Sequence, residues 1–87
     1  MSVPDMMARD PRQIGMALRR ARRAQRLTQS QLADKAGVTQ ATISLLENGL
    51  EGVKLKTVTD ILAALGLELV VRPRRTEAAA DDVAGLF

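Results

Sequence analysis

The chain has 87 residues, which is enough for one small domain, and 46% of them are hydrophobic. With a single Phe and neither Trp nor Tyr, the predicted core is aliphatic and methionine-rich. The sequence has no cysteine, which excludes disulfides and thiolate metal sites, and no histidine, the commonest metal ligand and general base. We therefore expect neither an enzyme nor a bound cofactor.

Charge is unevenly distributed along the chain. All 13 basic residues lie within residues 1–75, whereas residues 76–87 hold three acidic residues and no basic one. A basic body favours a polyanion such as DNA, and an acidic tail is repelled by it. No apolar run approaches the roughly 18 residues of a membrane span, and the N-terminus lacks the apolar segment of a signal peptide. We expect a cytoplasmic, nucleoid-associated protein with no membrane partner.

The first predicted helix follows a flexible N-terminus over residues 1–9, which mix Met, Pro and Asp without a period. Asp10 suits the N-cap, Pro11 suits the first helical position, and Gln13 completes a capping box. The helix is predicted to extend to about Arg26. Its apolar face consists of Ile14, Ala17, Leu18 and Ala21.

Two short helices are predicted next. Thr28 and Gln31 form a capping box that starts one of them, and Gly37 can take the left-handed conformation that ends it. Thr39 suits the N-cap of the following helix, which ends near Asn48. The inward positions are predicted to be Leu32, Ala33, Ala36, Val38, Ile43 and Leu46. Two short helices joined so tightly at small residues are a helix-turn-helix.

A fourth helix and a strand complete the predicted domain, which spans residues 10–73. After a loop over residues 49–54, a leucine-rich stripe of helical spacing ends at Gly66 and comprises Leu55, Val58, Ile61, Leu62 and Leu65. Residues 67–72 then alternate as in a strand. A lone strand leaves its ladder unpaired, so we expect it to pair across a two-fold homodimer through Leu67, Leu69, Val70 and Val71. Residues 74–87 are predicted to be a disordered acidic tail.

The outer face of the third predicted helix carries the candidate base-reading residues, which are Thr39, Gln40, Ala41, Thr42, Ser44 and Leu45. Gln40 is the first candidate, because an amide can bond bidentately to the adenine edge in the major groove. The alternative is that Gln40 is a solvated polar side chain. Ala41 and Leu45 can pack on thymine methyl groups, but Leu45 could instead extend the core or a dimer contact. Thr39 is a helix cap, a DNA contact, or both.

The sequence LTQSQLADKAGVTQATISLLENG resembles the Xre/Cro family of phage-repressor-type helix-turn-helix domains, over about residues 12–66. The resemblance implies an all-α, four-helix fold that binds double-stranded operator DNA, with an inverted repeat matching the dimer. The motifs QATIS and LENG and the terminal LELVV are similar to those of HipB-type antitoxins. In that group a dimeric repressor controls its own operon and binds a HipA-type serine/threonine kinase toxin, which we expect as a partner.

The resemblance also implies roles for single residues. Gln29 matches a phosphate-clamping glutamine at a helix N-terminus, although it could be no more than a first-turn residue. Arg22 and Glu47 match a pair that forms an internal ion pair. Further candidates for phosphate contact are Arg19, Arg23, Asn48, Lys54 and Lys56. The alternative for the arginines is a solvated helix face.

Two features leave the function open. Leu86 and Phe87 end the tail and could anchor in a toxin pocket, or could be an inert terminus. Besides an antitoxin, the sequence fits a stand-alone Xre-family regulator. A protein-interaction adaptor that no longer binds DNA is a third reading, which the polar recognition helix disfavours because an adaptor needs an exposed apolar patch there.

Overall fold

The computed structural model describes residues 5–49 and 52–74. These residues form four helices, namely α1 (Pro11–Ala24), α2 (Gln29–Ala36), α3 (Gln40–Glu47) and α4 (Leu55–Ala64). The predicted all-α fold with its helix-turn-helix is confirmed. Residues 1–4 of the predicted flexible N-terminus and residues 75–87 of the predicted tail lie outside the described part of the chain.

The ends of α1 differ in detail from the sequence-based expectation. Asp10 Oδ1 accepts from the Gln13 N–H at 2.8 Å, as in a capping box. Gln13 Oε1, however, accepts from the N–H of Arg9 at 2.7 Å rather than from that of Asp10. At the other end α1 stops at Ala24, two residues early, because Arg26 takes a φ of 58° in the left-handed region.

The turn between α2 and α3 follows the predicted local signals. Thr28 and Gln31 form both halves of a capping box, at 3.0 Å and 2.8 Å. Gly37 has a φ of 73°, a conformation that costs glycine nothing, and so ends α2. Thr39 Oγ1 then accepts from the Thr42 N–H at 3.2 Å and caps α3. In α2 and in α3, one first-turn N–H group is therefore capped by the side chain of the N-cap threonine.

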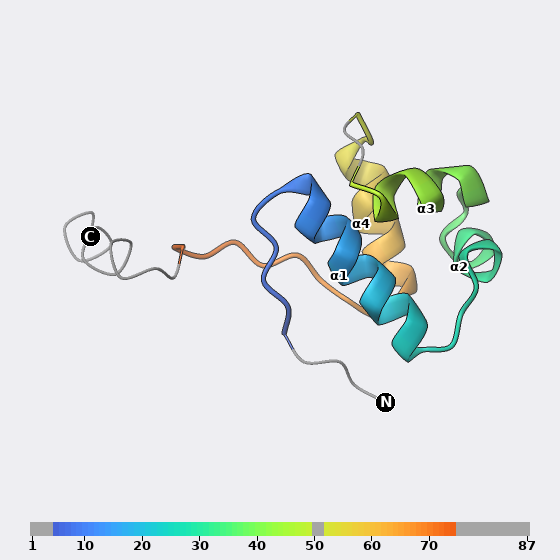
Figure 1. The fold of residues 1–87 in the computed structure, drawn as a ribbon, viewed down its shortest axis with the longest axis horizontal. Helices are drawn as coiled ribbons and strands as arrows, with labels where there is room; N and C mark the ends of the chain where they lie inside the picture. The colour runs from blue at the N-terminus through green and yellow to red at the C-terminus, as the bar shows by residue number, and fades with distance from the viewer. Residues whose placement is uncertain (1–4, 50–51, 75–87) are drawn as a thin grey trace.

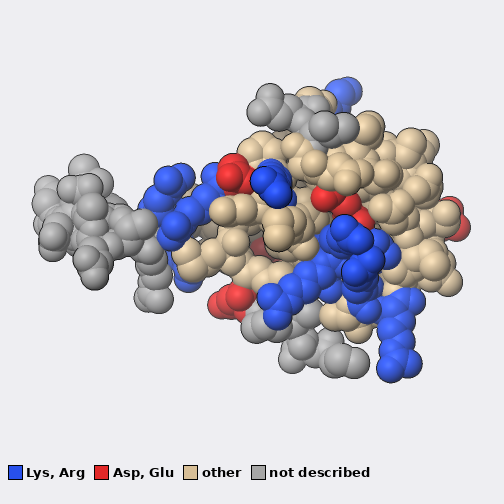
Figure 2. Space-filling model, viewed as in Figure 1, with Lys and Arg blue, Asp and Glu red and all other residues tan. Residues whose placement is uncertain are grey.

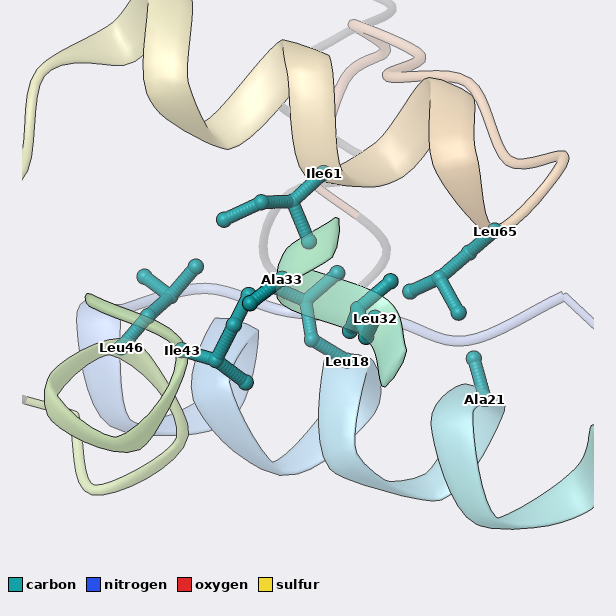
Figure 3. Close-up of a cluster of buried hydrophobic side chains, with 8 residues drawn as sticks. All are labelled: Leu18, Ala21, Leu32, Ala33, Ile43, Leu46, Ile61 and Leu65. Atoms are coloured by element: carbon teal, nitrogen blue, oxygen red, sulfur yellow. The ribbon is translucent and has the colours of Figure 1, made fainter. Parts of the chain in front are cut away.

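The core is aliphatic, as predicted, but the prediction of a methionine-rich core is wrong for the described residues. Met6 packs only against the edge of the buried cluster, and Met7 and Met16 are exposed. Helix α3 packs against α1 and α2, and α2 also packs against α4 (Figure 1). All four helices contribute to one cluster (Figure 3), which consists of Leu18, Ala21, Leu32, Ala33, Ile43, Leu46, Ile61 and Leu65. Burying each large side chain contributes about 1.5–3 kcal/mol, so this cluster fixes α3 relative to α1. Leu55 begins α4 but remains 67% exposed, outside the cluster.

Two glycines let α1 and the end of α3 approach closely. A Cβ on Gly15 would overlap the carbonyl oxygen of Leu46. A Cβ on Gly49 would lie 2.7 Å from Cα of Arg12, and the φ of Gly49 is 73°. These positions admit only glycine without a shift of backbone, so the α1–α3 crossing depends on them.

The segment after α4 leaves the helical body. Gly66 has a φ of 70°, and the Leu67 N–H bonds to the Leu62 carbonyl at 2.8 Å, which ends the helix. The chain then extends away from the helices on the side opposite α2 (Figure 1). Residues 67–74 form neither helix nor strand within this single chain. A ladder with a second copy would form only in a dimer, so the strand over residues 67–72 stays a prediction.

Candidate nucleic-acid interface

Two glutamines meet where α2 and α3 begin. Gln29 is the first residue of α2 and Gln40 the first residue of α3. The Gln40 Nε2 donates to Gln29 Oε1 at 2.6 Å. Because Gln40 is exposed and Gln29 only half-buried, this amide pair lies at the surface. The fold thus brings together the candidate base reader and the candidate phosphate clamp, a contact that the sequence analysis did not predict.

A buried ion pair lies directly behind the amides. Arg22 donates from Nε to Glu47 Oε2 at 2.6 Å, and from a second guanidinium nitrogen to Glu47 Oε1 at 2.9 Å. Arg22 also donates to the Leu27 carbonyl at 2.8 Å. Gln29 Nε2 donates to Glu47 Oε1 at 3.2 Å and so connects the pair to the surface. Arg22 and Glu47, the residues expected to pair, therefore join α1 to the end of α3 with bidentate geometry.

Both members of the pair remain charged near neutral pH. Burial by itself would raise the pKa of Glu47, but hydrogen bonds from Arg22 and Gln29 and the charges of Arg22 and Arg19 hold that pKa below its ordinary value. The hydrogen bond with Glu47 outweighs burial at Arg22 and raises the pKa of the guanidinium.

The rest of α3 and its N-cap present hydroxyl and apolar groups. The Thr39 and Thr42 hydroxyls bond to each other at 2.9 Å, so Thr39 combines its cap with a second contact. Ala41 is exposed and Ser44 half-buried. Leu45 is 47% exposed and is not part of the core, which removes one of the alternatives for this residue.

Basic side chains gather over α1 in Figure 2. An open groove of about 400 Å³ on the outer face of this helix is lined by Met16, Arg19, Arg20 and Arg23. It contains both arginines that we considered as phosphate contacts. The groove offers several guanidinium groups, which bind phosphate oxygens bidentately.

Two of the three other phosphate candidates, Asn48 and Lys56, have local partners. Asn48 Nδ2 donates to the Ser44 carbonyl at 2.8 Å and helps to end α3. Lys56 bonds to Asp60 at 2.8 Å in an exposed pair one helical turn apart, which contributes little to stability. Lys54 precedes α4 and is exposed. The exposed lysines can exchange such contacts for phosphate.

The tight turn, the paired amides at two helix starts and the basic face of α1 define a helix-turn-helix DNA-binding domain. The family described as Helix-turn-helix matches residues 18–71 of the sequence. The chain belongs to this family, as a helix-turn-helix protein of the Xre type.

Two relatives indicate which kinds of helix-turn-helix protein this chain resembles. Antitoxin HipB of Escherichia coli strain K12 is 39% identical over 61 residues, which make up 70% of this chain and 69% of HipB. An uncharacterized HTH-type transcriptional regulator of Sinorhizobium fredii, y4dL, is 38% identical over 69 residues. The match covers 79% of this chain but only 35% of that regulator, so the chain spans about a third of its length.

Solved structures agree with these relatives. A chain of a HipA-HipB-O2-O3 complex superposes with a TM-score of 0.74 and 34% identity, over 82% of this chain and 100% of that chain. A chain of a HipB-O4 20mer complex gives a TM-score of 0.75 with the same identity and coverage.

The comparisons test two expectations from the sequence, and the structure bears on a third feature. The resemblance to Xre-type domains and to HipB-type antitoxins is confirmed. Since these relatives are transcriptional regulators and antitoxins, the prediction that the chain is no enzyme is confirmed as well. In the described part of the chain, no helix is both long and apolar enough to cross a membrane.

Proposed function

We propose that this protein is a dimeric transcriptional repressor that inserts α3 into the major groove of operator DNA and reads adenine with Gln40. The observation that carries the proposal is the hydrogen bond between Gln40 and Gln29 at the exposed starts of α3 and α2. The bond occupies one N–H of Gln40 and leaves its Oε1 and its second N–H available. An acceptor beside a donor is the pattern that pairs with the N6–H and N7 groups of adenine.

The remaining groups of α3 fit the same docking. The Thr39 and Thr42 hydroxyls and that of Ser44 can reach base edges or phosphates, since a hydroxyl both donates and accepts. Exposed Ala41 and Leu45 can pack against thymine methyl groups.

Contacts with the phosphate backbone would hold the domain in register. Gln29 lies at the start of α2, where backbone N–H groups and the helix dipole favour an anion. The further phosphate contacts proposed are Arg19, Arg23, Asn48, Lys54 and Lys56. These contacts carry no sequence information but dominate affinity and its salt dependence.

A homodimer would double this surface. Three apolar side chains of the segment after α4 are open to solvent, with Leu69 58%, Val70 66% and Val71 93% exposed. Pairing of residues 67–72 with a second copy would cover them and satisfy both backbones. The resulting two-fold symmetry calls for an inverted repeat whose half-site centres lie about 34 Å, or a multiple of it, apart.

We further propose that the protein is the antitoxin of a kinase toxin and represses the operon that encodes both. The support is the similarity to HipB chains, one of them solved together with HipA and operator segments. Leu86 and Phe87, which lie outside the described residues, are the proposed toxin anchor. An operator-binding role would place the protein in the cytoplasm, with the nucleoid.

A stand-alone regulator is the second candidate function, which the similarity to the Sinorhizobium fredii regulator favours.

Footprinting on the DNA upstream of the protein's own reading frame tests DNA binding. We expect protection of an inverted repeat, and equal affinity for that fragment and for random DNA would overturn the repressor proposal. The antitoxin proposal requires a kinase encoded beside this gene, and calorimetry with such a kinase tests this partner. A chain ending at Arg75 should keep operator affinity but bind the kinase more weakly, and Phe87→Ala should reproduce much of that loss. Undiminished kinase binding by the truncated dimer would contradict the anchor.

A further inference from the structure

An unbroken path of hydrogen bonds leads from the buried Arg22 to the exposed Gln40. Arg22 donates to Glu47, Gln29 donates to Glu47, and Gln40 donates to Gln29. We propose that this path fixes which way the Gln40 amide faces, so that Glu47 is a positioning residue for base readout although it touches no base. The inference rests on the proposed function, because it requires that Gln40 meets a base.

The direction of the path is set at its buried end. A guanidinium has donors only and an ionised carboxylate has acceptors only, so the Arg22–Glu47 bond can run in one direction alone. Glu47 is 8% exposed, and its charge is maintained by the arginine. Any side chain that approaches the remaining lone pairs of Glu47 must therefore present a donor.

This requirement passes through Gln29 to Gln40. Gln29 has an amide whose oxygen and nitrogen ends have nearly the same shape, so its orientation is decided by its partners. Gln29 turns the nitrogen end of its amide toward Glu47, so the opposite end, Oε1, faces Gln40. Gln40 must then turn its own Nε2 toward Gln29, at 2.6 Å. The polarity of a buried ion pair is thus transmitted across two amides to the surface.

The orientation matters because adenine offers its donor and acceptor in a fixed order. Reversing an amide exchanges its acceptor and its donor, so only one orientation of Gln40 pairs bidentately with adenine in a given docking position. If Glu47 lost its acceptor character, both orientations of Gln29 would be allowed and Gln40 would no longer be held. Immobilising such a side chain again on DNA lowers affinity about 2- to 10-fold.

Binding titrations on operator variants test the inference. The relevant base pair is the one whose preference Gln40→Ala relaxes. Glu47→Gln keeps the size of the side chain but adds donors, and we expect it to lower the adenine preference at that base pair about 2- to 10-fold. Preferences at the other base pairs should not change. Asp34→Asn, which removes one negative charge from the exposed face of α2, is the matched control and should leave all preferences unchanged.

A second variant guards against misfolding. Arg22→Met combined with Glu47→Met replaces the ion pair by apolar side chains, a change that is often neutral or stabilising for the fold. It removes the acceptor for Gln29 and should lower the same preference. In a Gln40→Ala background neither change should have a further effect on base preference. A purely structural role would instead weaken binding to all sequences alike, and that result would overturn the inference.

An NMR measurement on the DNA-free protein separates this inference from the proposed function. The side-chain amide protons of Gln29 and Gln40 should exchange slowly with water in the unaltered protein and fast in both Glu47 variants. Unchanged exchange, or an unchanged adenine preference in a folded Glu47 variant, would refute the positioning role alone. Absence of operator preference in the unaltered protein would refute the proposed function, whatever the amide exchange shows.

Discussion

Gly15 in α1 lies directly against the carbonyl oxygen of Leu46 in α3, with no space for a Cβ between them. This contact brings the end of α3 onto α1, where Glu47 can reach Arg22. The position of α3 therefore depends on a glycine of α1 that takes no part in the Gln29–Gln40 amide pair.

We expect Gly15→Ala to destabilise the protein, although alanine favours helices. The added methyl group must move α3 or α1, and such overpacking costs about 1–3 kcal/mol. Urea unfolding measures the change, with exposed Ser30→Ala as a control that should stay within about 0.5 kcal/mol. A Gly15→Ala protein as stable as the original would show that the two helices can separate freely.

Removing one partner of the ion pair should lower the free energy of unfolding more than removing both partners does. Arg22→Met alone leaves the Glu47 carboxylate buried and uncompensated, and we expect a loss of about 3–5 kcal/mol in the free energy of unfolding. Arg22→Met with Glu47→Met should recover most of that loss. Thermal and urea unfolding of both proteins provide the comparison, and equal losses would argue against strong coupling between the two residues.

The Arg22–Glu47 pair should make the stability of the protein depend on pH in the acidic range. The pKa of Glu47 is held below its ordinary value of 4.5, so its contribution is fully present above that pH and is lost as the pH falls through the lower, folded value. The Arg22→Met, Glu47→Met protein lacks this contribution. As the pH is lowered below 4.5, its free energy of unfolding should therefore fall less than that of the unaltered protein. Parallel pH profiles for the two proteins would exclude Glu47 as the source.

Dimerisation should depend on the backbone of residues 67–72. Val70→Pro removes one N–H donor that a strand ladder would use, whereas Val70→Thr keeps the donor and the β-branched shape. We expect sedimentation to show a weaker dimer for the proline variant and a nearly unchanged one for the threonine variant. An unchanged dimer in the proline variant would count against strand pairing.

Local signals in the sequence were enough for the helix ends at Thr28, Gly37 and Thr39, because caps and left-handed turns depend on neighbouring residues. The requirement for Gly15 was missed because it arises from the backbone of α3, which only the tertiary fold brings near. The early end of α1 reflects the positive φ of Arg26, for which an arginine gives no warning.

In the candidate site, too, the contacts that depend on the tertiary fold could not be predicted from local sequence. The polar face of α3 and the Arg22–Glu47 pairing could be anticipated from residue types and from the family resemblance. The contact between Gln29 and Gln40 joins residues in different helices and depends on how closely α2 and α3 pack. Their positions as first residues of the two helices are the signal that could have indicated it.

We propose above that Gln40 reads a base, and operator titration of the Gln40→Ala dimer is the sharpest test of that role. Affinity should be measured for the operator, for operators changed at single base pairs, and for random DNA. We expect a loss of about 1–3 kcal/mol on the operator, a relaxed preference at one base pair per half-site and little change on random DNA. An equal loss of affinity on operator and random DNA would contradict it and make Gln40 a backbone contact.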